Sequence, residues 1–382
     1  MNNEARTNTL IKLFDFPKHQ VLIGDKGNRK VVAKDGSFHL LFDYATGLTL
    51  KYGHTPEEDP THCPFGPEIA DIEITTKCPG IRREDGLRTP CPWCYKSNTA
   101  NGENMSFETF KHVFDLLNAK KTLTQIAFGA DSSLESNPDV WKIFEYCREH
   151  MIVPNVTVAD ITPETAEKIV SLCGAVAVSW YPTINPDRCY DTVKLLLDES
   201  KKQNKHMQVN IHALLSKETF PLFDELINHY EKDERLSGMN AIVILSLKQK
   251  GRGEQFQIVK EEDFELLMDE FFEKKVRFGM DSCSATKFLK YLKKHPERGD
   301  LASMVEPCES FGLFSSYVNY LGVYYPCSFM EGVGNWKTGI DLMQVQDFEK
   351  EVWYSERLCK DRERSLNMIK KHGCTHCPYY EV

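Results

Sequence analysis

Residues 70–94 read ADIEITTKCPGIRREDGLRTPCPWC, in which a short strand-like run is followed at once by three cysteines. The run 70–76 is rich in β-branched residues, which is typical of a strand. Cys78 comes directly after it, and twelve residues separate Cys78 from the Cys-x-x-Cys pair Cys91 and Cys94. Three thiolates on one loop suit an iron–sulfur cubane with one open iron. Spacing alone also allows a zinc site with a fourth ligand from elsewhere, or a redox pair in which Cys78 has no role.

From Glu68 onward, strand-like and helix-like runs alternate. We expect strands at 70–76, 124–129, 152–159, 175–181, 207–215 and 240–248, and a further short one within 276–284. Amphipathic helices are expected between them, for example at 106–118 with Ser106 as N-cap and at 161–173. Six strand–helix repeats predict an α/β fold with a parallel sheet curled into a partial (β/α)6 barrel. Chemistry in such sheets lies at the carboxyl ends of the strands, which is where Cys78 falls.

Two segments flank this predicted core of residues 68–282. Residues 1–67 are predicted to form a strand-rich extension, because Gly-containing turns separate runs of β-branched and aromatic residues. The stretch 7–17 is the one candidate helix there, and it ends at Pro17. Residues 283–382 are rich in cysteine and aromatic residues, and we expect them to form a small metal-containing domain.

The composition is that of a soluble globular protein, with 41% hydrophobic and 27% charged residues. No apolar run approaches the length of a membrane span, and the N-terminus has no apolar signal region, so a cytoplasmic location is expected. A net charge of −9 without a long basic tract gives no reason to expect nucleic acid as a partner. Thirteen cysteines in a chain of this kind favour metal ligands over disulfides.

The C-terminal tail contributes a second group of cysteines, in two pairs: Cys308 with Cys327, and Cys374 with Cys377. The alternation of residues between Tyr317 and Tyr325 predicts a hairpin, which would bring the first pair together. Four such thiolates suit an all-cysteine zinc site or a [4Fe–4S] cluster equally well.

Four further cysteines have local surroundings that indicate their roles. Cys283 lies at a strand end and is held in reserve as a ligand of the second group. Cys147, Cys173 and Cys189 lie in apolar surroundings and are predicted to be buried packing residues.

The loop 78–94 resembles the signature of radical S-adenosylmethionine (SAM) enzymes, in which three cysteines follow the first barrel strand and an aromatic residue precedes the third. Trp93 takes that aromatic place, although the gap of twelve residues after Cys78 is longer than is usual. The resemblance covers about residues 70–310 and implies a [4Fe–4S] cluster held by Cys78, Cys91 and Cys94.

Further positions resemble the SAM contacts of this family. Gly129, Ala130 and Asp131 resemble the Gly-Gly-Glu-like turn after the second strand, which contacts the SAM amino group, with Asp131 supplying the carboxylate. Ser179 resembles the polar SAM contact after the fourth strand, and 245–254 the end of the sixth strand near the adenine. The resemblance implies that SAM is cleaved reductively to a 5′-deoxyadenosyl radical, which abstracts a hydrogen atom. It also implies an electron donor such as flavodoxin or ferredoxin.

The tail resembles the Twitch/SPASM region of radical SAM maturases, in which a cysteine, a glycine, four residues and a second cysteine precede a later Cys-x-x-Cys. This implies an auxiliary [4Fe–4S] cluster held by the four tail cysteines. Enzymes with such a tail most often crosslink, epimerise, excise or oxidise ribosomally made peptides, so a precursor peptide is the expected substrate.

Because residues 1–67 lack a three-helix pattern, we expect a separate small recognition protein or the barrel mouth to present the peptide. The alternatives are a dehydrogenase or mutase of a sugar or cyclitol and, outside enzymology, a zinc-stabilised binding protein.

Overall fold

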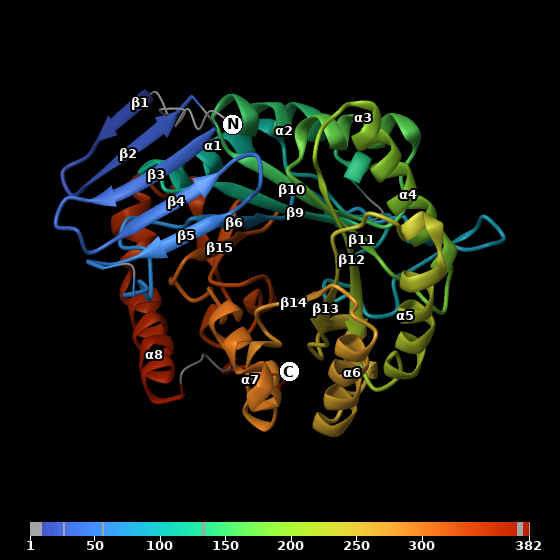
Figure 1. Cartoon of the computed structure of the whole chain (residues 1–382). Coiled ribbons are helices and arrows are strands. Elements are labelled where there is room, and N and C mark those ends of the chain that lie inside the picture. Colours follow the sequence, from blue (N-terminus) through green and yellow to red (C-terminus); the bar gives the residue numbers. More distant parts are fainter. Residues whose placement is uncertain (1–9, 26, 56, 132–133, 373–376, 382) are drawn as a thin grey trace, which may run out of the picture.

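The computed structural model describes residues 10–25, 27–55, 57–131, 134–372 and 377–381. This part of the chain forms three β-sheets of ten, five and two strands. In Figure 1 the five-stranded sheet lies at the upper left, and the ten-stranded sheet runs through the centre of the molecule. None of the helices in these residues is long and apolar enough to span a membrane.

The five-stranded sheet is built from the N-terminal residues and is antiparallel throughout. Its strands follow chain order: β1 (Leu10–Asp15), β2 (His19–Gly24), β3 (Asn28–Ala33), β4 (His39–Asp43) and β5 (Thr49–Tyr52). The prediction of a helix at 7–17 is wrong, because residues 10–15 pair with β2 instead. A helix this short is marginal on its own, whereas pairing with β2 satisfies its backbone groups and lets Phe14 and Phe16 pack on the core.

A buried arginine fastens this sheet to the central one. Arg29 on β3 donates hydrogen bonds to the carbonyls of Lys121 (3.3 Å), Leu123 and Met151 (2.9 Å), which lie just before two central strands. Its guanidinium also lies over the ring of Tyr44. The N-terminal sheet is therefore fixed to the amino-terminal edge of the parallel sheet, opposite the edge at which chemistry is expected.

The central sheet confirms the predicted alternation of strands and helices. Its order in space is β14 (Phe278–Met280), β13 (Ala241–Ser246), β12 (Gln208–Leu215), β11 (Ala175–Ser179), β10 (Val153–Val158), β9 (Gln125–Asp131), β6 (Ile69–Ile72), β15 (Ser315–Val318), β16 (Val323–Tyr325) and β17 (Ile340–Asp341). All neighbours from β14 to β15 are parallel, and the last two pairs are antiparallel.

The first strand of this sheet is shorter than the predicted 70–76, because β6 ends at Ile72. Beyond it the chain turns to a different neighbour: the amide of Thr76 donates to Glu103 (2.9 Å), and the Thr75 hydroxyl donates to Asn104 (2.6 Å). The residues between β6 and Cys78 thus belong to the loop that carries the cysteines.

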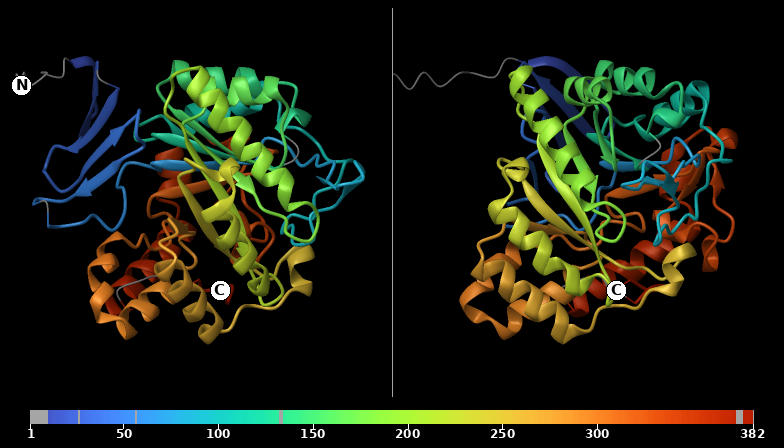
Figure 2. Two further views of the ribbon diagram at one scale, coloured as in Figure 1. Left: turned by 45° about the vertical axis from the view of Figure 1, so that its right-hand side comes forward. Right: turned by 90° about the vertical axis from the view of Figure 1, so that its right-hand side faces the viewer.

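The helices are α1 (Phe107–Leu117), α2 (Val140–Glu149), α3 (Pro163–Leu172), α4 (Pro186–Lys202), α5 (Phe223–Lys232), α6 (Glu261–Glu273), α7 (Ala285–Lys294) and α8 (Glu356–His372). Ser106 caps α1 as predicted, since its side chain accepts a hydrogen bond from the Thr109 amide. Figure 2 shows helices α1 to α6 along one face of the parallel strands.

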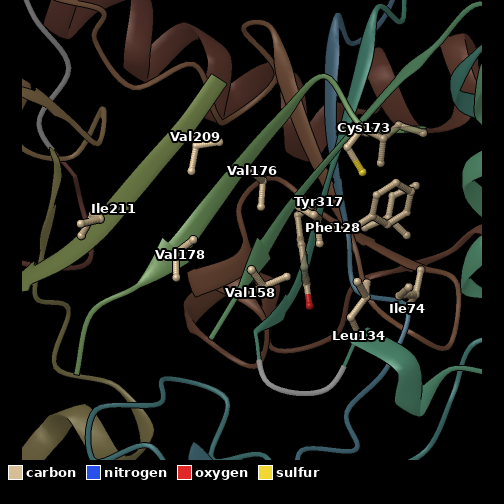
Figure 3. Packing of buried hydrophobic residues seen from close by; sticks show 14 of the residues in the cluster. Ile74, Phe128, Leu134, Val158, Cys173, Val176, Val178, Val209, Ile211 and Tyr317 are labelled. Atoms are coloured by element: carbon tan, nitrogen blue, oxygen red, sulfur yellow. The ribbon is translucent and has the colours of Figure 1, made fainter. Parts of the chain in front are cut away.

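The core lies between these helices and the sheet. Figure 3 shows side chains from successive strands meeting there, among them Phe128, Val158, Val176 and Ile211. Three cysteines belong to this core, as predicted: Cys147, Cys173 and Cys189 are buried. Burial raises the pKa of each of these thiols, which keeps them neutral packing residues.

The C-terminal residues join the central sheet. β15 lies parallel to β6, so the sheet crosses the predicted boundary at residue 283. β15 and β16 form the predicted hairpin, with Tyr317 opposite Tyr325. Helix α8 lies beneath the N-terminal sheet (Figure 1), and its Leu366 and Ile369 pack against the core of that sheet.

Candidate active site and cysteine centres

One face of the parallel sheet carries apolar residues beneath the helices, whereas the other carries small and polar ones. Residues in register on neighbouring parallel strands share a face. We call the second face the inner face. The register places its residues in three rows across the strands: Tyr317, Asp71, Ala127 and Asn155; then Gly129, Thr157, Ala177 and Asn210; and then Ser179 and His212. The inner face is therefore a polar surface made by at least six strands.

The inner face is open to solvent at its centre. Asp71 lies in the middle of the sheet, between β9 and β15, yet its side chain is exposed. Asn155, Thr157, Ser179 and His212 are also partly exposed. Since a central strand buries both faces when side chains fill the space above it, this exposure means that the inner face borders a hollow.

Electrostatics on the inner face favour uncharged forms. Although the Asp71 side chain reaches solvent, the protein that surrounds it displaces much of the nearby water, which raises its pKa to about 6, and Glu309 raises the pKa further. Desolvation also lowers the pKa of His212 to about 4, against the opposing effect of Asp281. His212 is therefore a neutral imidazole at physiological pH, able both to donate and to accept a hydrogen bond.

The three cysteines of the first group lie on one loop beyond the carboxyl end of β6. Cys91 and Cys94 belong to one small apolar cluster with Ile81, Ala159 and Tyr181. Cys91 is buried and Cys94 is partly exposed. Cys78 is partly exposed at the start of the loop, where its amide donates to the carbonyl of Thr99 (2.8 Å). The loop thus returns to its own beginning, with Cys91 and Cys94 in one cluster and Cys78 at the start of the loop beyond β6.

Trp93 fixes the loop against the ends of other strands. Its ring stacks on Tyr181, two residues past β11, with centroids 5.4 Å apart and planes at 16°. It also meets Phe256 edge to face at 5.8 Å. The predicted aromatic position is therefore a wall of the site that keeps water from Cys91.

The segment after β13 braces the cysteine loop, a role that the sequence did not predict. Arg252 donates to the carbonyls of Cys91 (2.7 Å) and Asn98 (3.3 Å) through its side chain, and to Cys94 (3.1 Å) through its amide. Gly251 has φ +57°, and a Cβ there would lie 2.5 Å from the carbonyl oxygen of Tyr95. The Gly-Arg-Gly sequence after a strand was the available signal, because such a turn permits this close approach.

The twelve residues between Cys78 and Cys91 form a small hairpin of β7 (Ile81–Arg82) and β8 (Arg88–Thr89). Asp160, two residues past β10, holds it: Arg82 donates to its Oδ2 at 3.0 Å, and Arg88 lies 3.6 Å from its Oδ1. The long gap in the cysteine pattern is thus an ordered insertion tied to the carboxyl end of the sheet.

A partly buried ionic network lies between the cysteine loop and the C-terminal residues. Lys96 lies 3.2 Å from the carboxylate of Glu73, forms an ion pair with Glu331 and donates to the hydroxyl of Tyr317 (2.9 Å). Asn319 donates to the other oxygen of Glu331 (2.8 Å). Because Lys96 is two residues past Cys94, this network fixes the loop to β15 and to the segment that follows β16.

The second group of cysteines surrounds a cavity. It is lined by Cys283, Cys308, Cys327, Cys377, Lys248, Ser282, Phe311, Phe329 and Tyr380. The centre of a water molecule has about 20 Å³ of space there. Burial, followed by the neighbouring Cys308, raises the pKa of Cys327 to about 12, and burial also raises the pKa of the Cys308 thiol. Bound iron would remove this cost, because it stabilises thiolates directly.

Cys283, the alternative ligand, lines the cavity as well. Cys374 lies outside the described residues, so its place relative to the cavity is not assigned. Within the described residues, no group of three or more His, Cys, Asp or Glu side chains is arranged to hold a single metal ion. This holds for Cys78, Cys91 and Cys94 as well. Four cysteines around one cavity are a ligand set that suits either an iron–sulfur cluster or an all-cysteine zinc site.

The predicted SAM contacts are placed in part. Gly129 and Ser179 lie on the inner face at the carboxyl ends of β9 and β11. Ala130 and Asp131 end β9, but their side chains are outside the described part of the chain. Asp71, Asn155, Thr157 and Asn210 were not predicted, because only the register between strands shows that they share a face.

Comparisons with known proteins find weak likenesses. No protein-family model matches the sequence, and no curated protein matches it significantly. Among solved structures, BtrN in complex with AdoMet and 2-DOIA has a TM-score of 0.37 and 12% identity over 80% of this chain and 88% of that one. BtrN in an open conformation has a TM-score of 0.33 and 12% identity over 82% and 92%. An HpcH/HpaI aldolase from Desulfitobacterium hafniense DCB-2 has a TM-score of 0.34 and 8% identity over 63% of this chain and 95% of that one. With TM-scores below 0.5, these likenesses do not place the chain in a family.

Proposed function

We propose that this chain is a radical SAM enzyme that abstracts a hydrogen atom from a small polar substrate, as a dehydrogenase or mutase of a sugar or cyclitol would. The observation that carries the proposal is one of position: three cysteines on a single loop lie at the carboxyl end of a parallel sheet whose inner face is polar and open. Cys78, Cys91 and Cys94 would hold a [4Fe–4S] cluster, which leaves one iron open for SAM.

When bound, the cluster and SAM together supply the 5′-deoxyadenosyl radical. The chain supplies the surroundings. Trp93 and Tyr181 exclude water from the buried side of the loop, and Arg252 fixes the loop carbonyls. Asp131, at the end of β9, is the candidate partner of the SAM ammonium group, and Ser179 is a further polar contact.

The chemistry of the inner face supports a polyhydroxylated substrate. Thr157 on β10 and His212 on β12 provide hydrogen-bonding groups, whereas the amide of Asn155 already bonds Gln125 and the Ala175 amide, and the Asn210 oxygen accepts from Asn240. Substrate hydroxyl groups can pair with Thr157 and His212, whereas an apolar substrate would desolvate these two side chains at a cost of about 1–3 kcal/mol each. For this reason we favour a sugar or cyclitol over the peptide expected from the tail.

The proposed enzyme also needs an auxiliary cluster and an electron donor. The thiols around the second cavity would hold an auxiliary [4Fe–4S] cluster, with Cys374 or Cys283 completing the set with Cys308, Cys327 and Cys377. A flavodoxin or ferredoxin would supply the reducing electron. A precursor peptide with its recognition protein stays the second candidate substrate.

The test follows a label from the substrate. Anaerobically reconstituted protein, a strong reductant and SAM are incubated with cyclitols and sugar alcohols deuterated at carbon, and 5′-deoxyadenosine is analysed by mass spectrometry. We expect deuterium in 5′-deoxyadenosine with at least one of these compounds, and no 5′-deoxyadenosine from the Cys91→Ala variant. Transfer from a deuterated precursor peptide alone would contradict the substrate class. Tightly bound zinc with no iron would contradict the enzyme itself.

A further inference from the structure

A single buried cation faces the cavity of the second cysteine group. Among the described residues that line this cavity, Lys248 is the only charged one, and none carries a carboxylate. Its side chain is 5% exposed, and its ammonium group lies 5.1 Å from the centre of the Phe329 ring. Taking an ammonium group out of water is costly, so its position beside the thiols needs a physical reason.

Asp281, which directly precedes the cavity-lining Ser282 and Cys283, holds the lysine. Lys248 forms an ion pair with Asp281, whose other oxygen accepts hydrogen bonds from the Ser284 hydroxyl (2.6 Å), the Ser284 amide (3.1 Å) and the Ser246 amide (3.3 Å). Burial opposes the charge of Lys248, but Asp281 and then Cys283 raise its pKa above the usual range. The carboxylate is thus anchored to the ends of β13 and β14, and the lysine that it holds lines the cavity together with the four cysteines.

We propose that Lys248 is a positioning residue that raises the reduction potential of the iron–sulfur cluster in this cavity. The inference rests on the auxiliary cluster of the proposed function. Four thiolates outweigh the positive charge of an iron–sulfide core, and reduction adds a further electron. A fixed cation against the thiolates therefore stabilises the reduced form more than the oxidised form, and net charge and hydrogen bonds to sulfur are what set such potentials.

The geometry gives two variants with opposite expected effects. Lys248→Met keeps the length of the side chain and removes the charge, so the potential should fall. Asp281→Asn removes the carboxylate that offsets the lysine, so the potential should rise. Lys248→Arg keeps the charge and is the matched control, with a potential near that of the wild type.

The measurement is a redox titration followed by electron paramagnetic resonance. It uses protein in which Cys78, Cys91 and Cys94 are all alanine, so that the auxiliary cluster alone gives the signal. Lys248→Met should lower the equilibrium constant for reduction at least tenfold, which is about 59 mV for a one-electron couple. Iron analysis of each variant shows whether the cluster is still bound.

The outcomes separate this inference from the proposed function. About four iron atoms per chain with an unchanged potential in both Lys248→Met and Asp281→Asn would overturn the role of Lys248. Shifts of the same sign in the two variants would overturn it as well. Should Lys248→Met lose its iron, Lys248→Gln, which also removes the charge, takes its place in the titration, and an unchanged potential in it would overturn the role of Lys248. No iron in the triple-alanine parent would contradict the auxiliary cluster itself.

Discussion

The ring of Tyr95 lies against the ring of Phe329, with centroids 4.4 Å apart. Tyr95 follows Cys94 directly, whereas Phe329 lines the cavity of Cys308, Cys327 and Cys377. The two cysteine centres, which are far apart in the sequence, therefore share a wall.

We predict that Tyr95→Ala weakens both centres at once. Removing a large ring from a packed site costs about 3 kcal/mol in unfolding free energy, since a cavity is left behind. Iron content should fall at both sites. Tyr95→Phe keeps the ring and should cost about 1 kcal/mol, because it loses only the hydrogen bond between the hydroxyl group and Ser328. Anaerobic denaturant unfolding and iron analysis measure both effects. A Tyr95→Ala protein with wild-type stability would show that the contact does not support the sites.

Iron content tests the two cysteine groups directly. Reconstituted protein should bind about eight iron atoms per chain, as expected for two cubanes. Changing Cys78, Cys91 and Cys94 together to alanine should leave about half of that iron. Cys147→Ala, in the core, is the control and should leave the iron content unchanged. A wild-type value near four would contradict the auxiliary cluster.

SAM binding tests the end of β9. Asp131→Ala should weaken the binding of SAM at least tenfold, because a carboxylate that pairs with the SAM ammonium group contributes more than a neutral hydrogen bond. Asp131→Asn keeps the shape of the side chain without its charge, so its affinity for SAM should lie between those of the wild type and Asp131→Ala. Equilibrium dialysis with labelled SAM on iron-loaded protein measures the affinity. Normal binding by Asp131→Ala would assign the role to another residue.

The pH dependence of stability should show the buried Glu68. Its side chain is 2% exposed and shares Lys51 with Glu309, at 3.4 Å and 2.7 Å respectively. Burial raises the pKa of Glu68 to about 7, against the effect of Lys51. The folded state therefore keeps a proton that the unfolded state releases near its usual pKa of 4.5.

The sign follows from this difference. Stability falls as pH rises from about 4.5 to about 7, by on the order of 3 kcal/mol in full. Glu68→Gln has no such ionisation, so its stability relative to that of the wild type should increase as the pH is raised from 5 to 8. Urea unfolding of the apoprotein at both pH values measures the gain. Parallel behaviour of the two proteins would show that Glu68 ionises normally.

Local sequence patterns were sufficient for the order of strands and helices, because β-branched runs and amphipathic runs differ in period. They failed at 10–15, where LIKLFD is too short for periodicity to separate a strand from a helix. The cysteine groups were visible because thiols at such spacings are rare. The role of Lys248 could not be predicted, since nothing near it in the sequence shows that it forms an ion pair with Asp281, directly after the next strand, at the edge of the cavity. The same holds for Lys96 and Glu331, which only the completed sheet brings together.

The pairing of β6 with β15 has a consequence for how the protein is made. β6 obtains its first neighbour, β9, soon after it leaves the ribosome, but its second neighbour is synthesised only after the whole parallel core. At ordinary rates of translation this delay is on the order of ten seconds or more. Through that time the middle of the future sheet has an unpaired edge, which can template aggregation. We therefore expect chains that end before Ser315 to aggregate. In the full chain, β15 of the cysteine-rich tail covers the open edge of β6 and so completes the nascent sheet.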